Sequence, residues 1–263
     1  MPVEKDCILW PVRFDSTSYA VKVIVGATTT TCAMTVTADR NYWTSGDGQA
    51  DSSTNNGTGD LCAILETCLN THAATSGFSV SVSASGFLTI SVSGGLTFSI
   101  EWGDAATTLD PVIFGFTATT YNSTGSSLES PNQTKGIWYS DKTRSTDSRD
   151  RQPVLGAVAE TISGLARVSR LSLPKKTREL GWQFIPQAKS LDEYAAATEP
   201  SGSFESAWLN GISKGYEFRV YDDASIRTSS SYGLYRVRSM DEPLTRSSAP
   251  VRFDIALSCA RAD

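Results

Sequence analysis

His72 is the only histidine among the 263 residues, so a catalytic triad or a histidine-based metal site would depend on it. It lies near the C-terminal end of a predicted helix, where the helix dipole favours a positive charge. The cysteines show neither a C-x-x-C pair nor metal-ligand spacing; they are Cys7, Cys32, Cys62, Cys68 and Cys259. We therefore expect His72 to be a surface or capping residue, the thiols to be reduced and mostly buried, and no metal or cofactor site.

Two carboxylate pairs are the remaining candidates for acid–base chemistry. Asp222-Asp223 follows a predicted strand, and Asp241-Glu242 precedes a proline. Two carboxylates hydrolyse glycosidic bonds when the fold holds them a fixed distance apart. Aspartate is also common in turns, because its side chain bonds to nearby backbone groups. We expect turn residues at both places and no enzymatic activity, with a glycoside hydrolase as the minor alternative.

Most of the six tryptophans fall at apolar phases of predicted strands or helices and are expected in the core. Trp43 and Trp138 flank polar loops, so they are the better candidates for exposed interface or ligand contacts. The one basic stretch is expected on the solvated face of a sheet. It contains Arg167, Arg170, Lys175, Lys176 and Arg178.

Charge and composition exclude several classes of protein. The net charge is −5 and charged residues make up 19% of the chain, which argues against a polybasic nucleic-acid binder. Serine and threonine form about a quarter of the chain, a composition suited to half-buried strands and turns rather than long helices. No run of 18 apolar residues occurs, so we expect no membrane partner.

The first half of the chain shows strand and helix signals. Residues 19–26 and 32–38 are predicted to form a hairpin across the threonine run 28–31. Asp60 is the expected cap of a helix near 60–73, whose apolar residues recur at spacings of three and four. Alternating segments then predict a three-stranded meander with turns at Ser85-Gly86 and Gly94-Gly95; they are FSVSVSA, FLTISVS and LTFSIEW.

The second half reads as another set of strands. Residues 166–173 and 178–186 are expected to pair, Ser203 to cap a short helix near 203–211, and 215–223 to pair with 231–239. Residues 251–258 alternate as a further strand. The predicted fold class is mainly β (α+β), with antiparallel sheets or a β-sandwich or barrel and one or two short packed helices.

The polar, turn-rich segment 125–152 is expected to be a linker or protruding loop. It would separate a β-rich domain at 1–124 from a second β-rich domain at 153–263.

Two stretches of the chain match patterns known from other proteins. The first runs from Tyr42-Trp43 through the helix and FSVSVSASGFLTISVSGGLTFSIEW to Phe114-Gly115-Phe116. It is similar to a tyrosine, helix, strands and Leu-Gly-Phe module of virion structural proteins, with Phe114 in place of the usual leucine. The second, FESAWLNGISKGYEFRVYDD at 204–223, is similar to tail proteins of tailed bacteriophages. In those proteins an aromatic helix leads into a G-x-x-F-R-x-Y-x-D strand, here Gly215, Phe218, Arg219, Tyr221 and Asp223.

The resemblance implies a structural tail component of the tube, distal-tail or baseplate type, made in the host cytoplasm and located in the virion. Its partners would be other copies of itself in a ring, such as a hexameric ring, and other tail or virion proteins. The acidic balance would suit DNA that passes through a lumen without specific binding. Arg219 and Tyr221 then join Trp43 and Trp138 as candidate interface or ligand contacts. The alternative is a carbohydrate- or receptor-binding β module of a virion.

Overall fold

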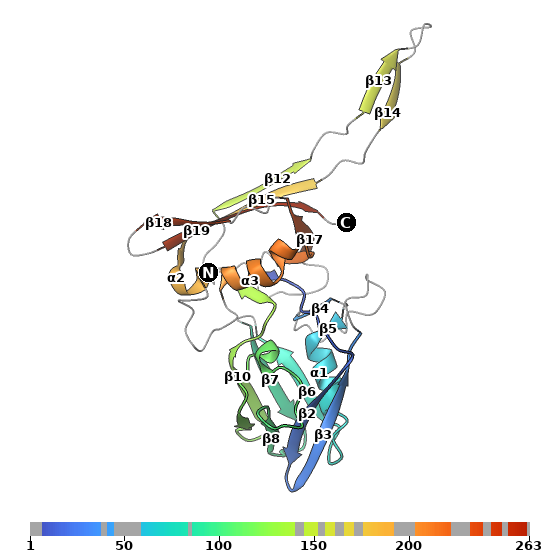
Figure 1. Ribbon diagram of the computed structural model, residues 1–263, viewed down its shortest axis with the longest axis vertical. Coiled ribbons are helices and arrows are strands. Elements are labelled where there is room, and N and C mark those ends of the chain that lie inside the picture. The colour runs from blue at the N-terminus through green and yellow to red at the C-terminus, as the bar shows by residue number, and fades with distance from the viewer. Residues whose placement is uncertain are drawn as a thin grey trace.

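The computed structural model describes residues 7–37, 41–44, 59–83, 86–139, 145–151, 156–160, 166–170, 176–191, 203–221, 232–238, 243–248 and 252–261. The molecule is elongated, with a body of two small sheets at one end and a large sheet with short helices above it (Figure 1). The strands pair antiparallel almost throughout, so the predicted mainly-β fold class is confirmed.

The N-terminal body contains two sheets and one helix, named here with their bounds. The first sheet has the order β3 (Thr28–Thr35), β2 (Ser18–Val25), β8 (Phe98–Glu101) and β9 (Thr120–Asn122). The second has the order β10 (Ser127–Gln133), β7 (Phe87–Val92) and β6 (Phe78–Val82). Helix α1 (Leu61–Leu69) packs against β3 and β6, and one apolar core fills the body.

Helix α1 begins where its sequence predicts. The Asp60 side chain accepts hydrogen bonds from the backbone N–H groups of Cys62 and Ala63, at 2.7 and 3.2 Å. It therefore satisfies two of the free donors that every helix start carries. Leu61, Leu65 and Leu69 are buried as their spacing requires. Just before the helix, β5 (Gly59–Asp60) pairs parallel with β4 (Tyr42–Trp43).

The hairpin of β2 and β3 is confirmed, but its turn is not the threonine run. The chain turns at Gly26-Ala27, and Gly26 has a positive φ of 59° that glycine tolerates without strain. The four threonines 28–31 lie within β3 and pair with 22–25. Threonine is a good strand former, so the run extends the hairpin instead of interrupting it.

The predicted meander is wrong in its third strand. β6 and β7 pair as expected, with Phe78 opposite Val92. β8 leaves this sheet and pairs with β2 and β9 in the other one. The apolar alternation of β8 is unchanged by this move, because Phe98 and Ile100 still point into the common core. Alternation predicts which face is buried and carries no information about the neighbouring strand.

The large sheet has eight strands, which come from both the N-terminal and the C-terminal parts of the chain. Its main order is β11 (Ile137–Tyr139), β1 (Cys7–Leu9), β16 (Phe218–Tyr221), β17 (Tyr232–Val237), β19 (Arg252–Arg261), β15 (Lys176–Pro186) and β12 (Thr146–Arg151). β18 (Leu244–Ser248) pairs with β19 off this path. The short helices α2 (Gln187–Ser190) and α3 (Phe204–Asn210) lie beside the sheet (Figure 1).

The expected domain division at 125–152 needs correction. β10 is an integral strand of the body, and β11 pairs with β1 in the large sheet, so 125–139 is not a linker. Leu128, Ile137 and Trp138 are buried in these strands. The N-terminal strand β1 lies between β11 and β16 and therefore belongs to the sheet of the C-terminal half. The two halves are interlocked through strand pairing.

A two-stranded ribbon lies apart from the large sheet (Figure 1). β12 pairs with β15, and beyond them β13 (Gly156–Glu160) pairs with β14 (Ala166–Arg170). The expected pairing of 166–173 with 178–186 is therefore wrong, because each segment has a different partner. In Figure 1 the β13–β14 end projects well away from the rest of the molecule.

The remaining predictions for the second half are confirmed where the structure describes them. The Ser203 hydroxyl accepts from the Ser206 N–H at 3.0 Å and caps α3, which ends at Asn210 with Gly211 as its C-cap. β16 pairs with β17, and the 251–258 segment lies within β19 from Arg252 onward. No helix in the described ranges is both long and apolar enough to cross a membrane.

Candidate functional site

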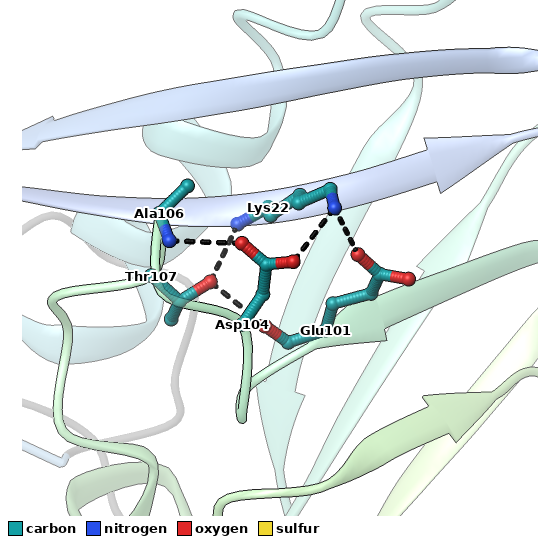
Figure 2. Close-up of polar contacts among 5 residues, drawn as sticks. All are labelled: Lys22, Glu101, Asp104, Ala106 and Thr107. Atoms are coloured by element: carbon teal, nitrogen blue, oxygen red, sulfur yellow. Dashed lines mark hydrogen bonds and ion pairs between the residues drawn. The ribbon is translucent and has the colours of Figure 1, made fainter.

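A cluster of charged side chains lies on the outer face of the body, around Lys22. The Lys22 ammonium is 2.7 Å from a Glu101 oxygen and 2.7 Å from an Asp104 oxygen. Figure 2 shows both carboxylates converging on this one nitrogen. Lys22 lies on β2 and Glu101 at the end of β8, which is the next strand of the same sheet. Asp104 follows in the turn after β8.

The same turn also holds the backbone of β2. The Thr107 hydroxyl accepts from the Lys22 N–H at 3.0 Å and donates to the Glu101 carbonyl at 2.8 Å. The Thr108 hydroxyl accepts from the Ala20 N–H at 2.9 Å, and the Thr108 N–H donates to the Ala20 carbonyl. β8 pairs with β2 only over 23–25, so these threonines take the place of a strand along 20–22. We call residues 104–108 the clip.

The contacts with Asp104 and Glu101 make Lys22 a poor nucleophile. Hydrogen bonds to Asp104 and then Glu101 raise the pKa of Lys22, which keeps the amine protonated. Lys22 and the Ala106 N–H together lower the pKa of Asp104, which keeps the carboxylate ionised. A general base needs a pKa near the working pH, and both shifts move away from it. The arrangement is therefore suited to holding strands together.

The Trp43 expectation is wrong, because its side chain is buried and only 1% exposed. Arg219 is also buried, and its guanidinium carbon lies 4.3 Å from the centre of the Trp43 ring. A cation over a tryptophan face is attracted by the negative charge density of the ring. Trp43 lies on β4 and Arg219 on β16, so the sequence-predicted site residues Trp43 and Arg219 do meet, but inside the molecule.

Trp138 is likewise buried, with no exposed surface. Its ring makes edge-to-face contacts with Trp182 and Phe204, each at 5.3 Å between ring centres. These contacts place it in the core beneath the large sheet. The backbone of Tyr221 pairs with β1 and β17, while its side chain lies outside the described part of the chain. No described residue of the predicted set offers an exposed aromatic surface.

His72 is buried, contrary to the surface position expected for it. Its Nδ1 accepts from the Ala74 N–H at 3.0 Å, and its ring packs edge-to-face against Phe78. The predicted capping role thus takes the form of an acceptor for the turn after α1. Among the described residues no group of histidine, cysteine or carboxylate side chains is arranged to hold a metal.

Of the basic stretch, the carboxylate pairs and the cysteines, some residues are buried and the others lie outside the described part of the chain. Arg178 is buried and donates to the Tyr235 hydroxyl at 3.2 Å, so the expected solvated face is wrong for this residue. The side chains of the other four residues of the basic stretch lie outside the described part, as do Asp222-Asp223 and Asp241-Glu242. All five cysteines are buried, which confirms their expected burial.

Sequence reasoning missed the Lys22 cluster, although a signal was present. Lys22 is the only charged residue in the apolar run of β2, and Glu101 has the same outward phase at the end of β8. Their contact depends on β8 lying beside β2, which the predicted meander excluded. Comparison with protein-family models, curated proteins and solved structures found no match for this chain.

Proposed function

We propose that this protein is a structural subunit of a virus particle, a tail component of the tube, distal-tail or baseplate type that assembles into a homo-oligomeric ring. The observation that carries the proposal is the β13–β14 ribbon. It projects from the large sheet, and its strands pair only with each other among the described strands (Figure 1). A two-stranded ribbon is marginally stable in water, so it gains most by packing on another surface.

The ribbon is long enough to reach a neighbouring subunit. Each strand of the ribbon has five residues and extends about 17 Å, and the ribbon projects away from the rest of the molecule (Figure 1). The β13–β14 ribbon of one copy would contact a different surface on the next copy. Such contacts are heterologous, and they close into a ring when the rotation between subunits allows it.

The state of the chemical groups supports a structural role over catalysis. Lys22 is bound by two carboxylates. The His72 side chain is buried and accepts a hydrogen bond from a backbone N–H group. The contact of Arg219 with Trp43 lies inside the molecule. The described part of the phage-like segment, 204–221, serves packing. α3 is followed by its C-cap Gly211, Gly215 has a positive φ of 75°, and Phe218 and Arg219 are buried in the large sheet. Other virion proteins, and DNA moving through a lumen without specific binding, are the partners that this role implies.

The test is the mass and shape of the purified chain across concentration, by light scattering and negative-stain microscopy. We expect rings or short tubes. Replacing 156–170 with a two-residue Asn-Gly turn should abolish them while the circular-dichroism spectrum and thermal midpoint of the body stay close to wild type. Thr97→Lys, an exposed change in the body, is the matched control and should assemble normally. A monomer at every concentration, or rings that persist without the ribbon, would contradict the proposal.

A further inference from the structure

The outer edge of β3 has hydrogen-bonding groups that nothing in the described structure uses. The two-residue turn after Val25 makes Val25 and Thr28 a hydrogen-bonded pair, and such pairs then alternate along the hairpin. At the other end of the hairpin, the Val36 N–H donates to the Thr17 carbonyl at 3.0 Å, as this alternation of hydrogen-bonded pairs requires. The intervening residues therefore direct their N–H and C=O groups away from β2. They are Thr29, Thr31, Ala33 and Thr35.

The neighbours of β3 leave this edge open. Helix α1 and the turn after it contact β3 through side chains on its core face, where Cys32 Sγ is 4.0 Å from the Leu69 carbonyl and the Ala73 N–H is 3.3 Å from the Thr30 hydroxyl. No described residue forms a hydrogen bond to the outward backbone groups. The side chains at the four outward positions are all exposed.

Three other edges of the described sheets are guarded. Along β6, Glu66 accepts from the Val80 N–H at 3.0 Å, and Asn70 bonds both the N–H and the carbonyl of Phe78. β12 has the sequence TDSRDR, in which alternating charges oppose pairing with a stray strand. β10 contains Pro131, which lacks a donor. β3, with the sequence TTTTCAMT, has no charge, proline or glycine to protect it.

The clip also keeps charge away from this edge. Lys22 lies opposite Thr31 in the register of β2 and β3, on the same outer face. Its ammonium is drawn to Glu101 and Asp104 on the β8 side (Figure 2). The threonine surface next to the edge is therefore uncharged, and a second uncharged strand can approach it without repulsion.

We propose that β3 pairs antiparallel with β3 of a second copy of this chain, about a two-fold axis at Cys32. This register places Thr29 opposite the other copy's residue 35 and Thr31 opposite its residue 33, so outward backbone groups face outward backbone groups. The contact is isologous and self-complementary, the commonest symmetry for a pair of identical subunits. It joins two four-stranded sheets into one sheet of eight strands. The inference is independent of the tail role and holds for a protein of any function.

Thr31→Pro is the most selective test. The Thr31 N–H points away from β2, so proline removes a donor only from the outer edge and leaves the internal ladder intact. Thr31→Lys is the second variant, since it places like charges across the two-fold axis. Thr97→Lys, the same charge change at an exposed site away from the edge, is the control. Mass is measured by sedimentation across concentration, with amide hydrogen exchange at residues 29, 31, 33 and 35.

We expect wild type and Thr97→Lys to form pairs, alone or within a larger assembly, and both Thr31 variants to lose them. The four outward amides should exchange slowly in wild type and rapidly in Thr31→Lys. A wild-type chain without paired subunits, or pairs that survive both Thr31 variants, would overturn the proposal. Deleting 156–170 leaves β3 intact, so loss of rings with retention of pairs, or the reverse, separates this proposal from the tail function.

Discussion

The guanidinium of Arg219 lies over the buried ring of Trp43, with 4.3 Å between the guanidinium carbon and the ring centre. The pair connects β16 of the large sheet to β4 beside the N-terminal body. Arg219 is paired with Leu9 of β1 in the large sheet, so the Arg219–Trp43 pair lies beside β1. The two halves of the chain are thus joined by a side-chain stack as well as by strand pairing.

This stack should be worth measurable stability. In a double-mutant cycle of Arg219→Met and Trp43→Leu, we expect a coupling of about 1–2 kcal/mol in the free energy of unfolding, because the pair is desolvated. The control is the pair Arg13 and Tyr216, with 4.1 Å between the guanidinium carbon and the ring centre, in which Arg13 is exposed and Tyr216 is half-buried. Its coupling should stay below about 1 kcal/mol. Equal couplings in urea denaturation would contradict the argument from burial.

The clip should depend on the Thr107 hydroxyl, which joins β2 to β8 through one donor and one acceptor bond. Thr107→Val keeps the shape of the side chain and removes both bonds. We expect a loss of about 1–3 kcal/mol in the free energy of unfolding, because the backbone groups left behind are partly buried. Thr97→Val, at an exposed position, should change it by less than about 0.5 kcal/mol. Equal losses of unfolding free energy in Thr107→Val and Thr97→Val would show that the clip does not stabilise the fold.

Asp104 should make the body more sensitive to acid. Its pKa is lowered by Lys22 and by the Ala106 N–H, so the folded state favours the ionised form. The stabilisation is complete above the ordinary value of 3.8 and is lost as the pH falls below it toward the lowered value. Asp104→Asn should therefore lose less stability than wild type between pH 5 and pH 2, measured by thermal unfolding. Parallel pH profiles would count against the ion pair.

Cys68 should produce an alkaline loss of stability. Burial raises the pKa of this thiol from 9.0 to about 12, and the nearby Cys32 adds to the shift. Between these values the unfolded chain releases the proton and the folded chain retains it, so stability is full below 9.0 and falls as the pH rises toward 12. The slope is about 1.4 kcal/mol per pH unit for one thiol. Denaturation at pH 8 to 10.5 should show a shallower decline for Cys68→Ala than for wild type.

Gly115 should tolerate no side chain. Its φ is 80°, and a Cβ there would lie 2.2 Å from the Asn132 carbonyl oxygen of β10. Gly94 has nearly the same φ, 79°, with open space around it. Gly94→Ala should cost about 1 kcal/mol from backbone strain alone, and Gly115→Ala at least about 2 kcal/mol more because the backbones must separate. Similar thermal midpoints for the two variants would contradict the close approach.

Local signals in the sequence predicted much of the fold. Asp60 and Ser203 are predictable as helix caps because their side chains bond to backbone groups only two or three residues away. The buried faces of β6, β7 and β8 followed from alternation, since successive side chains point to opposite sides of a strand. The pairing of β16 with β17 followed from their alternation and closeness in the chain.

Long-range neighbours were decided by the tertiary structure alone. Alternation did not distinguish β7 from β2 as the neighbour of β8, and proximity in sequence pointed to the wrong one. Trp43 and Trp138 border polar loops, yet both are buried by strands distant in the chain. The insertion of β1 between β11 and β16 had no sequence signal.

The sequence by itself therefore determined the mainly-β class, the caps, the buried faces and the buried thiols. The tertiary structure decided which strands are neighbours, and with that the Lys22 cluster, the Arg219–Trp43 stack, the projecting ribbon and the open edge of β3. The physical reason is the range of the forces: caps, turns and alternation act over a few residues of one segment. Strand order is set by which apolar faces pack together, and that depends on the whole chain.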